Sequence, residues 1–485
     1  MPAVGAPRKV IPIAAAAGGS SAELVSLYQS EAKIQMRSVS GWFAGWRWAL
    51  VWATQLLFYG LPWLQWSGRQ AVLFDLGARR FYIFNLVLYP QDVIYLAGLL
   101  IIAALALFLF TAVAGRLWCG FACPQTVYTE IFMWVERRFE GDRQARIRLD
   151  AAPWSARKLL RRGGKQAVWL AIGLWTGFTF VAYFSPARTL LTDAMALSLG
   201  PWETFWSLFY GFATYGNAGY MREQVCKYMC PYARFQSAMF DRDTLIISYD
   251  TERGEPRGSR ARGVAPASVG KGDCIDCTLC VQVCPTGIDI RKGLQYECIG
   301  CAACVDVCDS VMDKMGYPPG LIRYATQNSM EGRWSNQRMW QRVLRPRVLA
   351  YTAVLAVIVI AFLASLVLRT PFKANVVRDR GVLARLVDEG RIENVYRIQL
   401  MNATERTQRF RIEVDGLPGA VIAPTGATEV GATEARWVPL TVQITPQLAQ
   451  SLGSGAHPMH FRIALQETGQ TVTVVNEKST FVVPR

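Results

Sequence analysis

Histidine is almost absent from this chain of 485 residues. The two histidines, His457 and His460, lie close together near the C-terminus. Membrane electron carriers that hold haem b between helices need histidine ligands inside the bilayer, so that class of protein is excluded. Two histidines on an exposed loop form an incomplete ligand set and are usually solvated, although histidine is a common metal ligand. We therefore look for metal or redox chemistry elsewhere in the chain.

Cysteine outside short motifs is absent as well. All twelve cysteines fall into closely spaced groups, which leaves none for a disulfide or for an ordinary core position. The segment from residue 370 onward contains no cysteine. Free thiolates of this kind require a reducing compartment, so the cysteine-bearing segments are expected to face the cytoplasm.

Eight of the cysteines form two runs of the same spacing, C-x-x-C-x-x-C-x-x-x-C. This spacing is typical of bacterial two-cluster ferredoxins, in which the fourth cysteine of each run binds the other cluster. It predicts two 4Fe–4S clusters. Structural zinc is the alternative, but zinc sites usually show two separated pairs of cysteines. The predicted ligands are Cys274, Cys277, Cys280 and Cys308 for the first cluster, and Cys298, Cys301, Cys304 and Cys284 for the second.

Long apolar runs predict a membrane protein that carries soluble parts, in a chain that is 52% hydrophobic. A spanning helix needs about 20 apolar residues. The second and fifth candidate runs contain no charged residue, whereas the fourth is rich in Gly, Thr and Asn and gives the weakest signal. Trp residues gather near the ends of the runs, where their rings suit the membrane interface. The five predicted spans are residues 46–66, 93–114, 166–186, 204–221 and 348–368.

Basic residues predict the orientation of these spans. Residues 124–165 hold ten Lys or Arg, whereas the loops after the first and third spans hold four. The positive-inside rule therefore places the N-terminus and residues 222–347 in the cytoplasm, and residues after 369 outside. The net charge of +16 could indicate nucleic acid binding. Because the basic residues concentrate beside predicted spans, topology explains them and no nucleic-acid partner is predicted.

The remaining four cysteines form two C-x-x-x-C-P motifs just past the second and fourth spans. Corresponding cysteines are 107 residues apart, which indicates a weak parallel repeat that brings both motifs to one membrane face. Each proline either kinks a helix or begins a new one. Four thiolates together would suit copper(I), zinc or an iron–sulfur cluster, and spacing does not select among them. Met229 could add a thioether; ordinary buried cysteine is the structural alternative. These cysteines are Cys119, Cys123, Cys226 and Cys230.

The predicted fold is multi-domain: an α-helical membrane core of five spans, an inserted two-cluster bacterial-type ferredoxin domain of the α+β class, and a C-terminal immunoglobulin-like β-sandwich. Period-two alternation, as in residues 395–400, supports the sandwich. The predicted domains are a cytoplasmic extension (1–45), a four-span core (46–230), a cytoplasmic ferredoxin-like domain (231–346), a fifth transmembrane helix (347–369) and a periplasmic immunoglobulin-like domain (370–485).

Several stretches resemble the CcoG/FixG/RdxA family of cytochrome c oxidase accessory proteins, and the likeness runs from about Tyr28 to the end of the chain. The stretches are residues 272–290, 293–301, 312–317, 118–126 and 226–234. The resemblance implies a protein of the bacterial cytoplasmic membrane that reduces copper(II) to copper(I) for assembly of the cbb3-type oxidase. Copper would then be held by the four cysteines of the C-x-x-x-C-P motifs, which would be the catalytic residues.

That function implies a cytoplasmic electron donor, membrane lipid, and a copper transporter or copper chaperone as partners. The sequence leaves open whether the chain forms a homodimer. Two other functions also stay open. One is a quinol dehydrogenase subunit that passes electrons through the clusters, since membrane ferredoxins with similar motifs serve nitrate and nitrous oxide respiration. The other is a non-enzymatic copper chaperone or assembly scaffold, in which the clusters serve stability or sensing.

Overall fold

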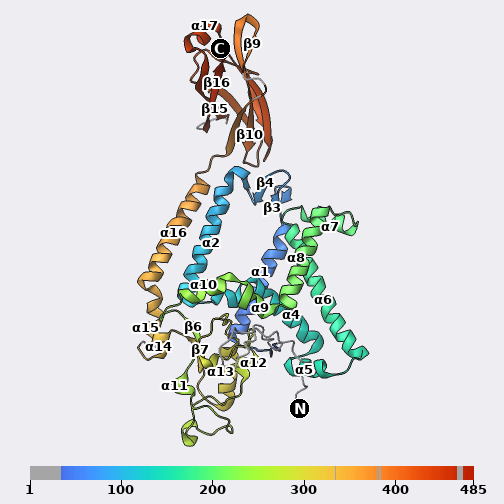
Figure 1. The fold of residues 1–485 in the computed structure, drawn as a ribbon, viewed down its shortest axis with the longest axis vertical. Helices are drawn as coiled ribbons and strands as arrows, with labels where there is room; N and C mark the ends of the chain where they lie inside the picture. The colour runs from blue at the N-terminus through green and yellow to red at the C-terminus, as the bar shows by residue number, and fades with distance from the viewer. Residues whose placement is uncertain (1–33, 334, 380, 382–383, 467–472, 485) are drawn as a thin grey trace, which may run out of the picture.

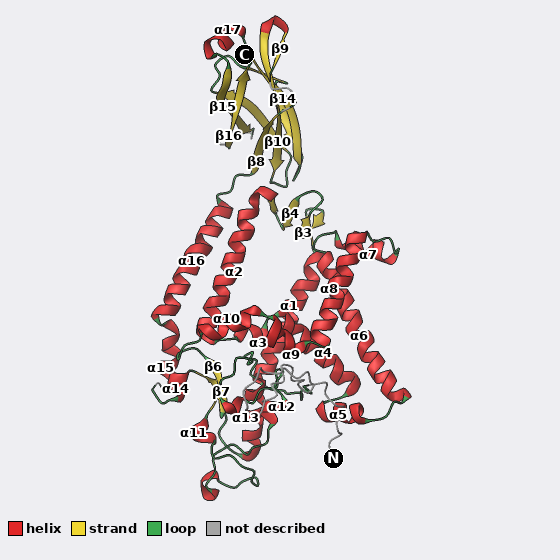
Figure 2. Cartoon of the chain, in the orientation of Figure 1, coloured by secondary structure: helices red, strands yellow, loops and turns green. Residues whose placement is uncertain are grey.

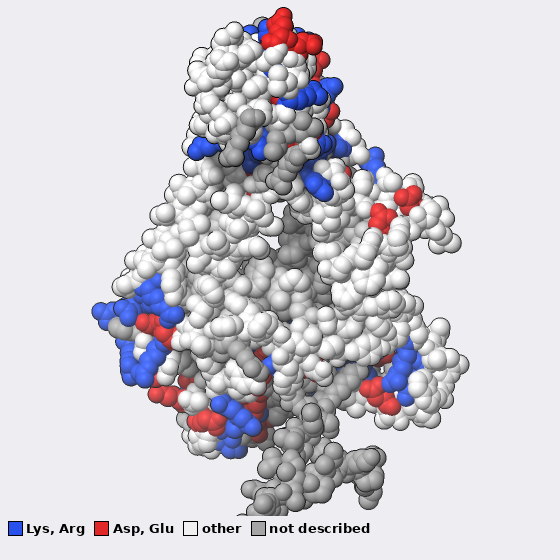
Figure 3. All heavy atoms as spheres, turned by 45° about the horizontal axis from the view of Figure 1, so that its top comes forward, with Lys and Arg blue, Asp and Glu red and all other residues white. Residues whose placement is uncertain are grey.

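The computed structural model describes residues 34–484 except 334, 380, 382–383 and 467–472. The chain forms three stacked parts along its long axis (Figure 1, Figure 2). A small mixed domain lies at one end, a group of long helices lies in the middle, and a β-domain lies at the other end. On the face seen in Figure 3, the helical middle carries few charged side chains, and these gather instead toward its two ends.

Five long helices form the middle part. Each overlaps one of the predicted spans. By length and composition, two segments are long and apolar enough to cross a membrane: Pro90–Ala114 and Pro346–Val367. Almost none of their residues are buried against other parts of the chain. The five-span core remains a prediction beyond these two. The helices are α1 (Trp42–Gly60), α2 (Val93–Ala114), α6 (Ala156–Val181), α8 (Pro201–Gly219) and α16 (Pro346–Val367).

The long helices pack in two groups. α2 lies beside α16, where the rings of Tyr95 and Phe362 meet edge to face and the Tyr95 hydroxyl donates to the Ser365 carbonyl. α6 packs against α8 at very close range, because a Cβ atom at Gly177 would lie 2.0 Å from the Ser207 carbonyl oxygen. Small residues that allow such contact are typical of helix pairs in membranes.

Most of the shorter helices lie on the side of the mixed domain, whereas α7 (Ala187–Met195) joins α6 to α8 at the opposite end (Figure 1). α3 and α4 follow α2, and α9 and α10 follow α8, so the two halves repeat the same order of elements. A π-helical turn, Val225–Met229, lies between α9 and α10. The bounds are α3 (Leu117–Phe121), α4 (Pro124–Glu140), α5 (Arg143–Ala151), α7 (Ala187–Met195), α9 (Arg222–Gln224) and α10 (Pro231–Met239).

The mixed domain is built on one antiparallel strand pair, β6 (Ile246–Tyr249) and β7 (Ile322–Ala325). α12 (Leu279–Gln282) and α13 (Ala303–Met315) pack against this pair around a buried apolar core. Short helices α11 (Thr251–Gly254), α14 (Gln327–Met330) and α15 (Asn336–Gln341) complete it. The α+β composition agrees with the predicted ferredoxin class.

The C-terminal β-domain is a sandwich of two antiparallel sheets, ordered β12-β14-β10-β8 with β9 beside β10, and β13-β11-β15-β16. Tyr396, Ile398 and Leu400 are fully buried on β10, as the alternation in the sequence predicts. The strands are β8 (Phe372–Arg378), β9 (Arg385–Val387), β10 (Arg391–Asn402), β11 (Gln408–Asp415), β12 (Val421–Ala423), β13 (Ala427–Val430), β14 (Ala435–Ile444), β15 (Gly455–Leu465) and β16 (Val474–Val483), with α17 (Pro446–Leu452) after β14.

A small sheet between α1 and α2 supports the β-domain. It contains β3 (Val72–Asp75), β4 (Arg80–Ile83) and β5 (Leu86–Leu88), and a two-residue pair, β1 (Gln65–Trp66) and β2 (Arg69–Gln70), precedes it. Tyr89 then donates a hydrogen bond of 2.8 Å to the Asn402 carbonyl of the β-domain. Buried Asp92 forms ion pairs with Arg369, which follows α16, and with Lys373, which lies in β8. The β-domain is therefore anchored to the helices at several points.

Candidate metal centres

The first predicted set of four cysteines lines a single cavity in the mixed domain. Cys274 and Cys277 lie in the loop before α12, Cys280 lies in α12, and Cys308 lies in α13. The rest of the lining is mainly apolar, comes from β6, α12, α13, β7 and the loops beside them, and includes Arg291. Thr278 adopts a left-handed conformation, with φ of 57°, directly before α12. This tight turn separates the second and third cysteines of the run.

The second predicted set lines a neighbouring cavity, which Cys280 of the first set also borders. Cys284 follows α12, Cys298 and Cys301 lie in the loop before α13, and Cys304 lies in α13. Ala302 adopts the same left-handed conformation directly before α13, with φ of 57°, at the position that corresponds to Thr278. The two runs thus repeat one local geometry. The fourth cysteine of each run lies with the other run, as the ferredoxin rule predicts.

The donor chemistry of both cavities fits a polynuclear cluster. No three His, Cys, Asp or Glu side chains within the described part of the chain converge on a site for one metal ion. The thiolates that hold a 4Fe–4S cluster lie farther apart than the ligands of a single metal ion, because each of the four irons takes one thiolate. Burial raises the pKa of Cys308 and of Cys298 to about 12, and neighbouring cysteines add to the shift. Burial therefore disfavours the thiolate form of these cysteines, and the positive charge of a bound metal would favour it.

The four cysteines of the C-x-x-x-C-P motifs come together beside the mixed domain. Pro124 and Pro231 are the first residues of α4 and α10, so each proline begins a helix, and Cys123 and Cys230 directly precede those helices. Burial raises the pKa of Cys226 to about 12, and the other three cysteines of the set raise it further. We call Cys119, Cys123, Cys226 and Cys230 the four-cysteine set.

Crossed hydrogen bonds hold the two motifs together. Gln236 of α10 accepts from the Cys119 thiol at 3.3 Å. Gln125 of α4 donates to the Arg222 carbonyl at 3.2 Å, four residues before Cys226. Each motif is thus fixed by a glutamine from the half that carries the other motif. α10, which we predicted to begin the ferredoxin-like domain, packs on α2 here, since the hydroxyls of Tyr232 and Thr111 lie 2.9 Å apart.

The four-cysteine set lies directly against the second cluster cavity. A Cβ atom at Gly120 would lie 2.7 Å from the Gly300 carbonyl oxygen and 2.8 Å from the backbone nitrogen of Cys301. Arg47 of α1 donates a hydrogen bond of 2.5 Å to the Cys301 carbonyl. Arg116 donates to the Cys298 carbonyl and to the Ala233 carbonyl, and so joins the cluster loop to the start of α10.

A carboxylate of the mixed domain also caps a long helix. Asp306 of α13 accepts hydrogen bonds from the backbone nitrogens of Phe43 at 3.1 Å and Ala44 at 2.7 Å. These are free donors in the first turn of α1, where a negative charge is favoured. The mixed domain is therefore attached to the helices beside the loop that holds Cys298 and Cys301.

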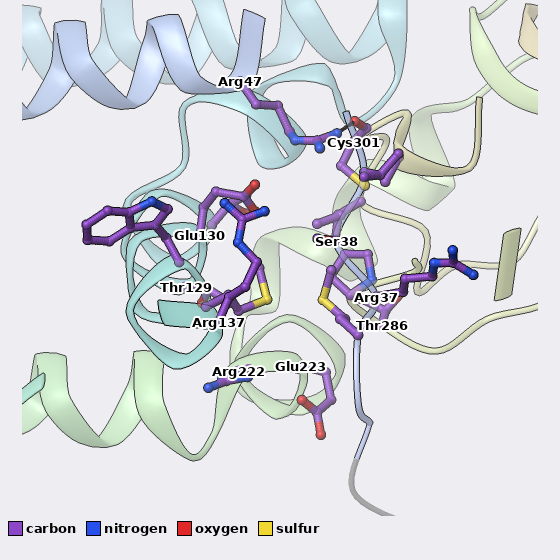
Figure 4. Close-up of a pocket in the computed structure, with 18 of the residues that line it drawn as sticks. Arg37, Ser38, Arg47, Thr129, Glu130, Arg137, Arg222, Glu223, Thr286 and Cys301 are labelled. Carbon is purple, nitrogen blue, oxygen red and sulfur yellow. Dashed lines mark hydrogen bonds between the residues drawn. The ribbon is translucent and has the colours of Figure 1, made fainter. Parts of the chain in front are cut away.

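A larger cavity opens between the helices and the mixed domain (Figure 4). Its lining includes Cys226 of the four-cysteine set and Cys301 of the second cluster set. In the figure, Arg47 and Cys301 lie on one side, and Thr129 and Arg137 of α4 lie on the other. Because one space touches both thiol groups, a molecule inside it would lie next to two predicted redox centres.

Other residues suggested by the sequence lie apart from these centres. Met229 is 55% exposed and does not line the cavity beside Cys226. We predicted a loop for His457 and His460, but both lie on β15 of the β-domain, and His457 lies within 2.9 Å of the Gly453 carbonyl oxygen. Sequence reasoning missed Arg116, Gly120 and Gln236. Gly120 had one signal, since a glycine between two cysteines marks close backbone approach.

Three family profiles match separate segments of the chain. A 4Fe–4S dicluster domain matches residues 221–327, an immunoglobulin-like fold at the C-terminus of FixG matches residues 362–484, and a 4Fe–4S binding domain matches residues 96–141. The first two confirm the predicted ferredoxin and immunoglobulin-like domains. The third contains only two cysteines, Cys119 and Cys123.

Three relatives match most of the chain. "Nitrogen fixation protein FixG" of Rhizobium meliloti is 38% identical, over 86% of this chain and 87% of the relative. The chain belongs to the FixG/RdxA family. "Protein RdxA" of Cereibacter sphaeroides is 42% identical over 81% and 84% of the two chains, and "Protein RdxB" of the same organism is 43% identical over 80% and 83%.

Membership of the FixG/RdxA family confirms the resemblance stated above. Together with the dicluster domain and the two cysteine-lined cavities, it identifies an iron–sulfur electron-transfer protein. When bound, the clusters supply and accept single electrons. The chain itself provides the thiolates, the apolar walls that exclude water, and the contacts that hold the clusters next to the four-cysteine set.

Proposed function

We propose that this FixG-family chain reduces copper(II) to copper(I) at the four-cysteine set, with electrons that enter through the two-cluster domain. One observation carries the proposal. Backbone atoms of Gly120, next to Cys119, pack directly on the loop that holds Cys301. This contact supports electron delivery to the four-cysteine set, because the set then lies beside the second cluster and not at a remote surface.

Copper suits this set as a substrate. Copper(I) prefers thiolate and thioether ligands, and copper(II) is reduced by one electron, which is the unit that iron–sulfur clusters transfer. No three of the four thiols converge on a single-ion site. The copper ion would therefore be held by one or two of them at a time, which suits an ion that is reduced and passed on.

We further propose the membrane arrangement that the sequence predicts. Five spans would place the mixed domain in the cytoplasm and the β-domain in the periplasm of a bacterial inner membrane. The two long apolar helices and the charge-poor surface of the middle part support this arrangement (Figure 3). The partners would be a cytoplasmic electron donor and a copper transporter or chaperone that serves assembly of cbb3-type cytochrome c oxidase.

A third iron–sulfur cluster at the four-cysteine set is the second candidate. It is favoured by the match of a 4Fe–4S binding domain to residues 96–141, which hold two of the four cysteines. The other two, Cys226 and Cys230, would complete the ligands. The chain would then be an electron-transfer subunit, as in the quinol dehydrogenase alternative, and not a copper reductase.

Metal analysis of a fourfold serine variant separates the candidates. In C119S/C123S/C226S/C230S, purified without oxygen, we expect iron to stay at about eight atoms per chain, the content of two four-iron clusters. Binding of copper(I), measured against a copper(I) chelator, should be lost. A wild-type content of about twelve iron atoms that falls to about eight in the variant would instead establish the third cluster. Unchanged copper binding in the variant would contradict the proposed site.

A further inference from the structure

The cavity between the helices and the mixed domain has the position of a substrate site. It encloses about 100 Å³, several times the space that one water molecule needs. Cys226 and Cys301 both line it. Anything held there lies between the second cluster, which supplies electrons, and a thiol of the set that we propose to receive copper.

The charge of the lining is basic. Five arginines face three acidic residues around the cavity: Arg37, Arg47, Arg137, Arg146 and Arg222 against Glu130, Asp142 and Glu223. Free hydrated copper(II), a dication, would be repelled from such a site. A small anion would be attracted, because a cleft lined by one sign of charge concentrates ligands of the other sign.

Some hydrogen-bond donors of these arginines have no acceptor among the residues that the structure describes. Arg146 and Arg222 both donate to the same carboxylate, that of Glu136. Nε of Arg146 and one terminal nitrogen of Arg222 are buried, and no described residue offers either of them a hydrogen-bond acceptor. Arg137 makes no side-chain hydrogen bond or ion pair among the described residues, and its neighbour on the cavity wall is Glu130 (Figure 4). Buried guanidinium nitrogens without acceptors are costly unless a ligand supplies them.

The lining also contains soft ligands. Met36, from the segment before α1, and Met133 of α4 lie in the same cavity wall as Cys226. Thioether and thiolate sulfurs are the ligands that copper(I) prefers. A basic cavity alone would fit any small anion. Sulfur ligands in the same wall favour an anion that carries copper.

We propose that copper enters this cavity as a small anionic chelate, such as a copper(II) carboxylate complex, and not as a free or cationic ion. This inference rests on the proposed copper reduction and names its substrate class. In the step, the chelated copper(II) gains one electron and becomes copper(I). That electron would come from the cluster held by Cys284, Cys298, Cys301 and Cys304, which would be oxidised by one electron and reduced again by the cytoplasmic donor. No proton is needed, and the chelator leaves as copper(I) passes to sulfur ligands.

The test compares R137Q with R138Q in the full chain with its clusters. Both arginines are exposed on α4, but Arg138 does not line the cavity. Equilibrium dialysis with oxidised protein and no reductant measures binding without turnover. The probes are copper(II) citrate, which is anionic, copper(II) bis-ethylenediamine, which is a dication, and metal-free citrate.

We expect R137Q to bind copper(II) citrate roughly three- to fivefold more weakly than wild type, the effect of one partly exposed charge. R138Q should bind like wild type, the cationic complex should not lose affinity in R137Q, and high salt should shrink the difference. Unchanged binding of copper(II) citrate by R137Q, equal losses in both variants, or equal affinity for metal-free citrate would overturn the inference. Selective binding of copper(II) citrate without any copper reduction would contradict the proposed function and leave the inference standing.

Discussion

Replacement of Gly120 by alanine perturbs the contact on which the proposed electron path depends. The added Cβ would lie 2.7 Å from the Gly300 carbonyl oxygen, whereas ordinary contacts begin at 3.4 Å, so the two segments must separate by about 0.7 Å. The neighbouring atoms belong to backbone and cannot turn away as a flexible side chain would. Gly300 itself has φ of +68°, a conformation that side-chain-bearing residues rarely adopt, so this loop cannot easily rearrange.

We expect G120A to cost about 1–3 kcal/mol in free energy of unfolding, which is typical for overpacking. Transfer of electrons should slow as well, because electron tunnelling weakens as the distance between the two centres grows. The assay measures copper(I) production with a colorimetric chelator under a fixed reductant. Iron content and the visible absorbance of the clusters, measured on the same sample, report whether the clusters are intact.

G45A is the matched control, because no atom of the described residues lies within 4 Å of a Cβ atom at Gly45 in α1. Its copper(I) production and cluster content should equal those of wild type, with stability unchanged or slightly raised. If G120A retains its clusters and produces copper(I) at the wild-type rate, the contact between Gly120 and the Cys301 loop does not position the electron path, and the reasoning is refuted.

Two further predictions concern the attachment of the domains. D306A should lower the free energy of unfolding by about 1.5–3 kcal/mol, because two helix N-terminal donors lose a charged acceptor. The temperature at which half of the clusters are lost on heating measures this effect. D313A, on the exposed side of α13, is the control and should leave this temperature almost unchanged. Equal temperatures for D306A and D313A would count against the cap. In the β-domain, burial raises the pKa of Glu393, but hydrogen bonds from Gln443 and Arg385 outweigh it and leave the pKa below its usual value of 4.5. A carboxyl group whose pKa is lower in the folded protein than in the unfolded chain stabilises the fold at pH values above the unfolded pKa, and this contribution is lost as the pH falls. The midpoint temperature of thermal unfolding of the β-domain should therefore fall below about pH 4.5 in wild type, and it should fall less in E393Q. An identical acid profile in E393Q would show that this carboxylate does not contribute.

The cysteine groupings could be predicted from the sequence because ligand spacing is local. Three cysteines two residues apart must share one turn, and the exchange of the fourth follows from ferredoxin geometry. Each predicted set lines one cavity in the structure. The four-cysteine set also comes together, because the two halves repeat the same order of helices. The β-sandwich was readable from alternation alone.

Contacts between the parts could not be predicted in this way. The interlock of Gly120 with the Cys301 loop joins segments 180 residues apart, and it leaves no periodic signal in either. The anchoring of the β-domain through Asp92 and Arg369 is equally remote in sequence. α10 illustrates the same limit: its sequence follows the second motif into the mixed domain, yet Tyr232 bonds to α2 because tertiary packing decides its place.

Single-turnover oxidation of the clusters tests the central claim most directly. The clusters are reduced without oxygen, excess reductant is removed, and copper(II) is added while cluster absorbance and copper(I) are followed together. We predict that wild type forms one copper(I) for each cluster that is reoxidised, and that C119S/C123S/C226S/C230S, with the same cluster absorbance at the start, does so far more slowly. Equal rates in the two proteins would contradict the claim that the four-cysteine set is where copper receives its electron.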